Sequence, residues 1–195
     1  AQRGVTAGLP VQPTRFDLAT VLASAVALTA WALHPQGMAV GIALAIVGTL
    51  QLFRLSRWAG WRTLSEPIVW ILHLGYAWVG IGMVLLGLSC LTDAIARSAA
   101  IHALTAGAAG TMILAVMTRA TRGHTGRLIQ ADALTVALYA AVTVGAALRV
   151  TAALGLVDYL TGVGLGGALW IAAFALFVLG YGPMLTRNHA ADPTR

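Results

Sequence analysis

Two histidines lie inside long apolar stretches of the sequence, and a third lies in a basic segment between two such stretches. His73 follows Trp70 within one apolar stretch, His102 begins the small-residue segment HALTAGAAGT, and His124 lies in RATRGHTGRL. Polar side chains inside a bilayer are costly, so each histidine is a candidate for function. Neutral imidazole is a common metal ligand, and an apolar pocket favours its neutral form. These positions are typical of a metal or haem site.

The arginines around these histidines suit anionic ligands. A guanidinium group holds a carboxylate through two parallel hydrogen bonds, which is how arginine could bind haem propionates. The candidates of this kind are Arg62, Arg119, Arg122 and Arg127. Arginines at helix ends are also expected as anchors of membrane topology, and a buried histidine can simply bond a neighbouring helix. Both interpretations remain open from the residues alone.

Helix geometry separates the two intramembrane histidines by depth. His73 lies about six residues, or roughly 9 Å, from one end of its helix, and His102 about four residues, or roughly 6 Å, from the opposite face. The two rings are then on the order of 15 Å apart along the membrane normal. One metal ion is therefore not expected to bind both. The expected groupings are His73 with His124, and His34 with His102.

The elements that carry these residues are apolar enough to cross a membrane. The chain of 195 residues is 59% hydrophobic and 9% charged, with a mean hydropathy of +0.84. Soluble domains have about a quarter of their residues charged. Six apolar runs, each near the roughly 20 residues that a transmembrane helix needs, occupy 17–34, 38–55, 67–88, 98–118, 130–153 and 164–185. The sequence therefore predicts an all-α polytopic membrane protein, a bundle of six transmembrane helices.

These runs divide the chain into a polar N-terminal segment or linker at 1–16, a six-helix transmembrane domain at 17–187, and a polar C-terminal tail at 188–195. Six crossings place both termini on one side. Of the twelve basic residues, all except Arg97 and Arg149 fall on that side. By the positive-inside rule, that side is cytoplasmic. We expect a multi-pass protein of the bacterial inner (plasma) membrane with cytoplasmic termini and no nucleic-acid partner.

The other patterns in the sequence do not indicate a catalytic site. No Ser, His and Asp constellation and no pair of carboxylates indicates hydrolysis, so the residues specify no reaction. The single cysteine, Cys90, cannot form an internal disulfide. The segment GVGLGG, residues 162–167, matches a dinucleotide fingerprint but lacks the preceding strand, so close helix packing explains it better.

Three segments together resemble one family. They are GWRTLSEPIVWILHLGYAWVGIG, HALTAGAAGTMILAVMTRATRGHTGR and AALRV, and the ending LWIAAFALFVLGYGPMLTR extends the match to nearly the whole chain. The chain resembles the NnrS family of haem- and copper-containing bacterial membrane proteins linked to the nitric oxide response. Within that family it resembles the C-terminal half. A partner that supplies an N-terminal half, or another membrane subunit, is therefore expected beside the lipid bilayer.

The resemblance implies haem b and copper as cofactors and nitric oxide, or a similar small molecule, as ligand. It implies metal ligation by His73, His102 and His124, and cofactor binding by His73, His102, Arg62, Arg119 and Arg127. The expected function is a haem- and copper-binding integral membrane protein in nitric oxide binding, response or tolerance to nitrosative stress. Two alternatives remain open, a cofactor-free transporter or permease half and a quinol-linked b-type cytochrome subunit.

Overall fold

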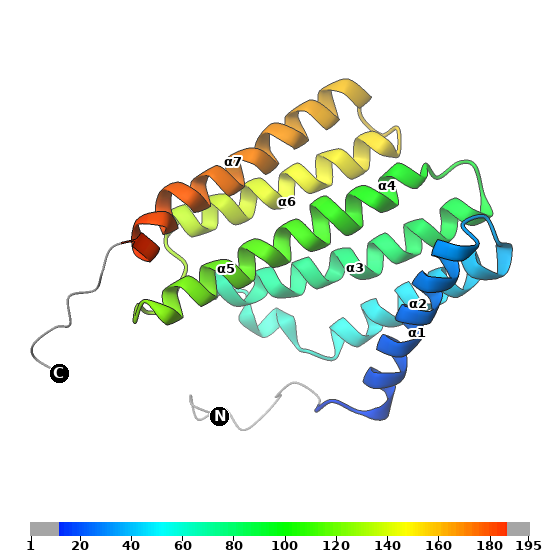
Figure 1. Cartoon of the computed structure of the whole chain (residues 1–195), viewed down its shortest axis with the longest axis horizontal. Helices are drawn as coiled ribbons and strands as arrows, with labels where there is room; N and C mark the ends of the chain where they lie inside the picture. Colours follow the sequence, from blue (N-terminus) through cyan, green and yellow to red (C-terminus); the bar gives the residue numbers. More distant parts are fainter. Residues whose placement is uncertain (1–11, 187–195) are drawn as a thin grey trace, which may run out of the picture.

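The structure, a computed structural model, describes residues 12–186 and folds them into helices joined by short turns (Figure 1). Helices α1 (Arg15–Leu33) and α2 (Met38–Ser56) precede a short 3-10 helix, η1 (Gly60–Thr63), and α3 (Pro67–Leu91). The helices α4 (Arg97–His102), η2 (Ala103–Ala109) and α5 (Gly110–His124) follow one another directly, and η2 is a π-helix. The chain then forms α6 (Ala133–Ala153) and α7 (Tyr159–Thr186).

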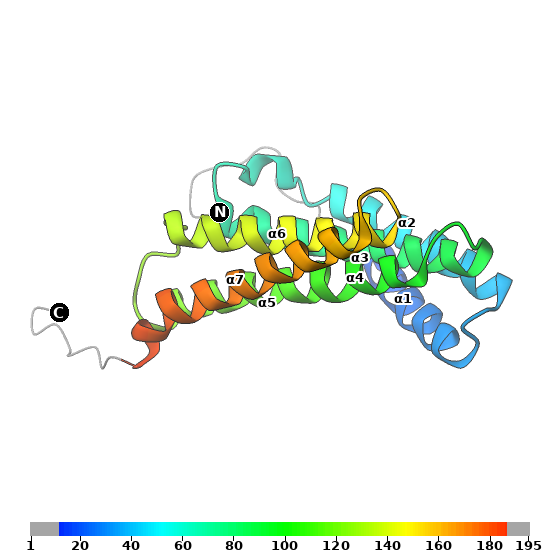
Figure 2. The same cartoon turned by 90° about the horizontal axis from the view of Figure 1, so that it is seen from above.

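The predicted bundle of six transmembrane helices is confirmed. Six helical stretches are long and apolar enough to cross a membrane, and α4, η2 and α5 together make one of them, Arg97–His124. Figure 1 shows α3 to α7 running alongside one another and α1 at an angle to them, and Figure 2 shows α6 above α5 in that view. The predicted polar tail at 188–195 lies outside the described residues, as do residues 1–11 of the predicted N-terminal segment.

The fourth and sixth spans extend furthest beyond the predicted ends. The fourth continues to His124 instead of ending near residue 118, and the sixth begins at Tyr159 instead of 164. The fourth span includes Arg119 and Arg122, because helix α5 continues while the Arg122 side chain turns inward to the buried Tyr181 and to Asp132. The sixth span starts early because Asp158 accepts the backbone N–H of Thr161 and so caps the helix.

Helix α3 lies at the centre of the bundle and contacts α2, α4, η2, α5 and α6. Glycines bring α2 and α3 close together, as small residues do in membranes. A Cβ at Gly48 would lie 2.7 Å from the Val84 backbone nitrogen, and one at Gly87 would lie 2.5 Å from the Gly41 carbonyl oxygen. The segment GVGLGG acts in the same way, since a Cβ at Gly166 would lie 2.7 Å from the Gly145 carbonyl oxygen. Close helix packing therefore explains Gly166.

Candidate functional site

The small-residue segment after His102 folds as the π-helix η2, and two tryptophans pack against it. A Cβ at Gly107 would lie 2.7 Å from Cγ of Trp78, and one at Gly110 would lie 2.5 Å from Nε1 of Trp170. The Trp170 indole also donates a hydrogen bond to the Ala106 carbonyl oxygen at 3.3 Å. Two indole rings therefore cover the helix surface at Gly107 and Gly110. A flat macrocycle such as haem cannot lie against these glycines. Short π segments inside α-helices are frequent at functional sites.

The His102 side chain lies at the start of this π segment and lines a cavity of about 400 Å³. We call it the His102 cavity, and its walls come from α4, η2, α6 and α7. They are His102, Thr105, Ala106, Arg149, Gly167, Trp170 and Ile171. Arg149 enters along the glycines of α7, because a Cβ at Gly167 would lie only 3.2 Å from its Nη1 atom. Gly166 and Gly167 thus make room for a cationic side chain inside a transmembrane bundle.

The two ionisable groups of the His102 cavity are not hydrogen-bonded to the protein among residues 12–186. Both side chains are partly buried, and neither His102 nor Arg149 makes a hydrogen bond or an ion pair there. Buried charges are normally paired, so an unpaired cation beside a free imidazole is a feature that a bound ligand would explain. Arg149 is not among the cofactor-binding residues that the sequence predicts. Only the packing of α6 against α4 and η2 brings it to His102.

His73 lies in a separate groove near the start of α3. Its Nδ1 atom is 3.3 Å from the Val69 carbonyl oxygen, and its ring meets that of Trp58 edge-on with centroids 6.1 Å apart. The loop that carries η1 covers the ring, since a Cβ at Gly60 would lie 2.6 Å from Cδ2 of His73. We call this site the His73 groove. It has a volume of about 310 Å³ and is lined by Leu55, Ser56, Gly60, Trp61, Leu64, Trp70, His73 and Leu74.

The contacts between α3 and the fourth span set the relative depths of the histidines. Gly75 meets Met112 and Gly82 meets Leu104, so the two helices run antiparallel. His73 is then level with about residue 114, and His102 with about residue 84, which separates them by roughly 16 Å along the helices. His124 lies about ten residues, or roughly 15 Å, beyond the level of His73. The predicted ligands His73, His102 and His124 are thus not brought together.

The predicted arginines lie away from the His102 cavity. Arg62 is exposed on η1, Arg127 is exposed after α5, and Arg119 is partly buried on α5. His124 is exposed at the last residue of α5. Within residues 12–186, no group of three or more His, Cys, Asp or Glu side chains is arranged to hold a metal ion.

A buried polar cluster that the sequence did not reveal surrounds Arg122. The Arg122 guanidinium pairs with Asp132 and donates from Nε to the Tyr181 hydroxyl at 3.1 Å. The Thr135 hydroxyl donates to Asp132 at 2.6 Å and lies 2.5 Å from that of Tyr181. Burial alone would raise the pKa of Asp132, but the hydrogen bonds from Thr135 and the charge of Arg122 lower it overall. This cluster joins α5, α6 and α7.

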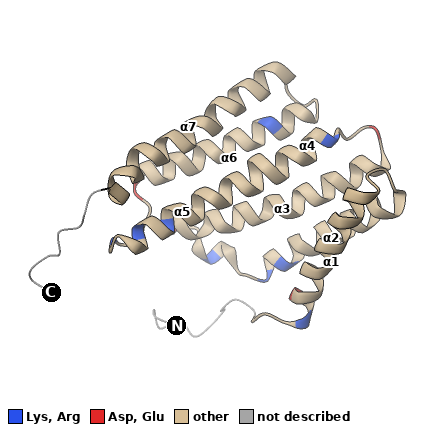
Figure 3. Cartoon of the chain, viewed as in Figure 1, with Lys and Arg blue, Asp and Glu red and all other residues tan. Residues whose placement is uncertain are grey.

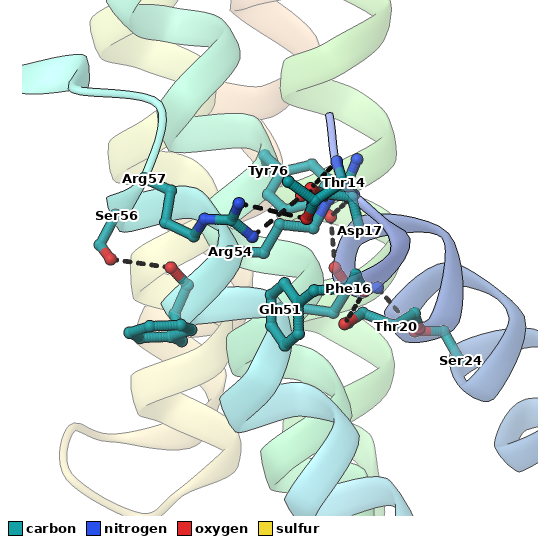
Figure 4. A network of polar contacts seen from close by, with 11 residues as sticks. Thr14, Phe16, Asp17, Thr20, Ser24, Gln51, Arg54, Ser56, Arg57 and Tyr76 are labelled. Carbon is teal, nitrogen blue, oxygen red and sulfur yellow. Dashed lines mark hydrogen bonds and ion pairs between the residues drawn. The ribbon is translucent and has the colours of Figure 1, made fainter. Parts of the chain in front are cut away.

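A second cluster joins α1, α2 and α3 (Figure 4). Arg54 donates from Nε to Asp17 at 3.0 Å and from Nη1 to the Tyr76 hydroxyl at 2.5 Å. Arg57 pairs with the other Asp17 oxygen at 3.4 Å. The Tyr76 hydroxyl donates to Gln51, whose amide donates to Ser24 at 2.6 Å. Because its groups satisfy one another, this cluster is suited to docking α1 rather than to binding a ligand.

Comparisons with known proteins assign the chain to one family. The family model described as NnrS protein matches residues 2–189, nearly the whole chain. No curated protein and no solved structure matches the chain significantly.

Proposed function

Because the chain belongs to the NnrS family, we propose that it binds haem within the membrane and takes part in the bacterial response to nitric oxide. Family membership and the multi-pass helical bundle support this proposal. The resemblance that links the family to haem and nitric oxide supplies the expected cofactor and ligand. The imidazole and guanidinium groups that line the His102 cavity support haem as that cofactor.

The observation that carries the proposal is the pairing of His102 and Arg149 in one cavity. The donor set fits haem, because a histidine imidazole is a common axial ligand of haem iron and a guanidinium group suits a propionate. Both groups lack protein partners within residues 12–186, so neither would have to give up a hydrogen bond. When bound, haem iron would supply a binding site for a diatomic ligand such as nitric oxide.

The residues of the chain have distinct roles in this proposal. His102, just before η2, would hold the haem iron, and Arg149 on α6 would hold a propionate group. Trp170 is fixed by its hydrogen bond to Ala106 and keeps that wall of the cavity apolar. An apolar ligand such as nitric oxide reaches such a site through the bilayer. The surrounding apolar shell then limits the access of water.

The proposal is restricted to haem. The resemblance also implies copper, but His73, His102 and His124 lie at three different depths of the bundle. The described residues therefore offer no set of three ligands to one copper ion, and we derive no role through copper.

Absorption spectroscopy and iron analysis of the protein purified from haem-replete cells test this proposal. We expect a Soret band in the wild type that is lost in His102→Ala and weakened in Arg149→Ala. Arg149→Lys keeps the positive charge but loses the paired N–H donors of the guanidinium group, so this variant should retain part of the Soret band. His34→Ala is the matched control, because His34 is exposed in a loop, and should leave the band unchanged. A wild type without a Soret band, or a His102→Ala variant with a normal one, would overturn the proposal.

A further inference from the structure

The His73 groove combines aromatic walls with one ionisable side chain, that of His73. Trp61 and Trp70 line it together with three leucines, and no charged side chain is among the described residues of its walls. The Ser56 hydroxyl already donates to the Phe53 carbonyl oxygen at 2.7 Å. The groove is therefore suited to a neutral, flat molecule, since aromatic rings stack on one another and an ionic headgroup would find no counter-charge.

The hydrogen bond of His73 fixes which kind of ligand group the groove can bind. The Val69 carbonyl oxygen can only accept, so Nδ1 of His73 carries the hydrogen at this contact. In a neutral imidazole the other nitrogen, Nε2, is then an acceptor. A ligand that bonds Nε2 must therefore present a hydrogen-bond donor to it, as a hydroxyl group does. Gly60 lies on that side of the ring, because a Cβ there would be 3.1 Å from Nε2.

The loop over His73 is held in an unusual conformation. Ala59, directly before η1, has a φ of 52°, in the left-handed region that residues with a side chain seldom adopt. Such a conformation is uphill in energy and persists only when its surroundings hold it. Gly60 then meets the His73 ring without a Cβ. The loop at Ala59 and Gly60 thus forms a wall of the groove in contact with the His73 imidazole.

We propose that the His73 groove binds the headgroup of a membrane quinol, with one phenolic hydroxyl donating to Nε2 of His73. The aromatic ring of the quinol lies against Trp61 and Trp70, and its apolar tail leaves toward the lipid. A quinone lacks the hydroxyl hydrogen and binds less well to this tautomer of His73. The inference does not depend on haem at His102, which lies roughly 16 Å away along the helices.

Isothermal titration calorimetry of the protein in detergent micelles, under anaerobic conditions, tests this proposal with decylubiquinol as the probe. We expect saturable binding that is about tenfold tighter than that of decylubiquinone, the difference that one hydrogen bond makes. His73→Leu should weaken quinol binding by a similar factor and remove the preference for quinol. Trp61→Leu should also weaken binding, and because Trp61 is 63% exposed this variant keeps the fold intact.

Glycine variants supply a matched pair of controls. Gly60→Ala should displace the His73 ring and weaken quinol binding, whereas Gly164→Ala should not, because a Cβ at Gly164 meets no atom within 4 Å. Equal binding of quinol and quinone, or decanol competing as well as the quinol, would overturn the proposal. A Soret band lost in His73→Leu but kept in His102→Ala would also overturn it, because His73 would then be a haem ligand.

Discussion

Arg122 and Arg149 are both arginines inside transmembrane helices, and they differ in what their guanidinium groups bind. Arg122 pairs with Asp132 and donates to Tyr181, and it is only 8% exposed. Arg149 has no such partner within residues 12–186. A satisfied buried charge stabilises the fold, whereas an unsatisfied one indicates a ligand site. Substituting Arg122 should therefore lower the stability of the fold, whereas substituting Arg149 should affect ligand binding instead.

We expect Arg122→Met to lower the free energy of unfolding by about 1–3 kcal/mol, because Asp132 and Tyr181 lose their donor. Arg149→Met removes no hydrogen bond and should cost less than about 1 kcal/mol. Thermal unfolding of the haem-free proteins in one detergent measures both effects. Equal losses of stability in the two variants would contradict the distinction between a structural and a ligand-binding arginine.

At the scale of elements, the approach of α2 to α3 depends on glycines that face a backbone. We expect Gly48→Leu to destabilise the protein by about 1–3 kcal/mol, the usual cost of overpacking. Its Cβ would lie 2.7 Å from the Val84 nitrogen, and a backbone atom cannot rotate away as the end of a side chain can. The melting temperature of the variant in detergent is the measurement.

Gly164→Leu is the control for this change, because it adds the same side chain on α7 where a Cβ meets no atom within 4 Å. Its melting temperature should stay near that of the wild type. If Gly48→Leu and the control have the same melting temperature, α2 and α3 do not pack as closely as described.

The sequence predicted these elements well because hydrophobic run length is a strong local signal. All six spans were identified, and their ends were missed mainly where a side chain contact decides them. Helix α5 continues through Arg122 because Tyr181, far along the chain, accepts from its guanidinium. The π-helix after His102 had no distinct signal either, since the small residues of HALTAGAAGT suit any close packing. The position of this π-helix depends on contacts with Trp78 and Trp170, which come from other helices.

The candidate site was predictable only in part, for a related reason. His102 could be found because a histidine in an apolar run is conspicuous. Its neighbour Arg149 could not be linked to it, since the two residues lie on different helices and only the packing of α6 against the fourth span joins them. The predicted arginines Arg62, Arg119 and Arg127 were chosen because they lie in the segments that resemble the family, and they lie away from the cavity.

For the whole molecule, the distribution of charge predicts its orientation. Figure 3 shows most basic residues gathered at the end of the bundle where α1 begins and α5 ends. Arg97 and Arg149 are the described exceptions near the opposite end. By the positive-inside rule we propose that the arginine-rich end faces the cytoplasm of a bacterial inner membrane. The His102 cavity then lies in the outer half of the membrane and the His73 groove in the inner half.

Labelling of single cysteines tests this orientation. In a Cys90→Ser background, Asp93→Cys and Arg127→Cys place exposed thiols at opposite ends of the bundle. A membrane-impermeant maleimide added to intact spheroplasts should label the cysteine at 93 and reach the one at 127 only after lysis. Labelling in the reverse order would invert the proposed topology.

The central claim is that the imidazole of His102 binds haem iron, and rescue of a cavity variant tests it most directly. His102→Gly removes the ligand and leaves space for a free imidazole molecule. We predict that the purified variant lacks the Soret band of the wild type and regains it when haem and millimolar imidazole are supplied together. A His102→Gly protein that shows the wild-type band without imidazole would contradict the account.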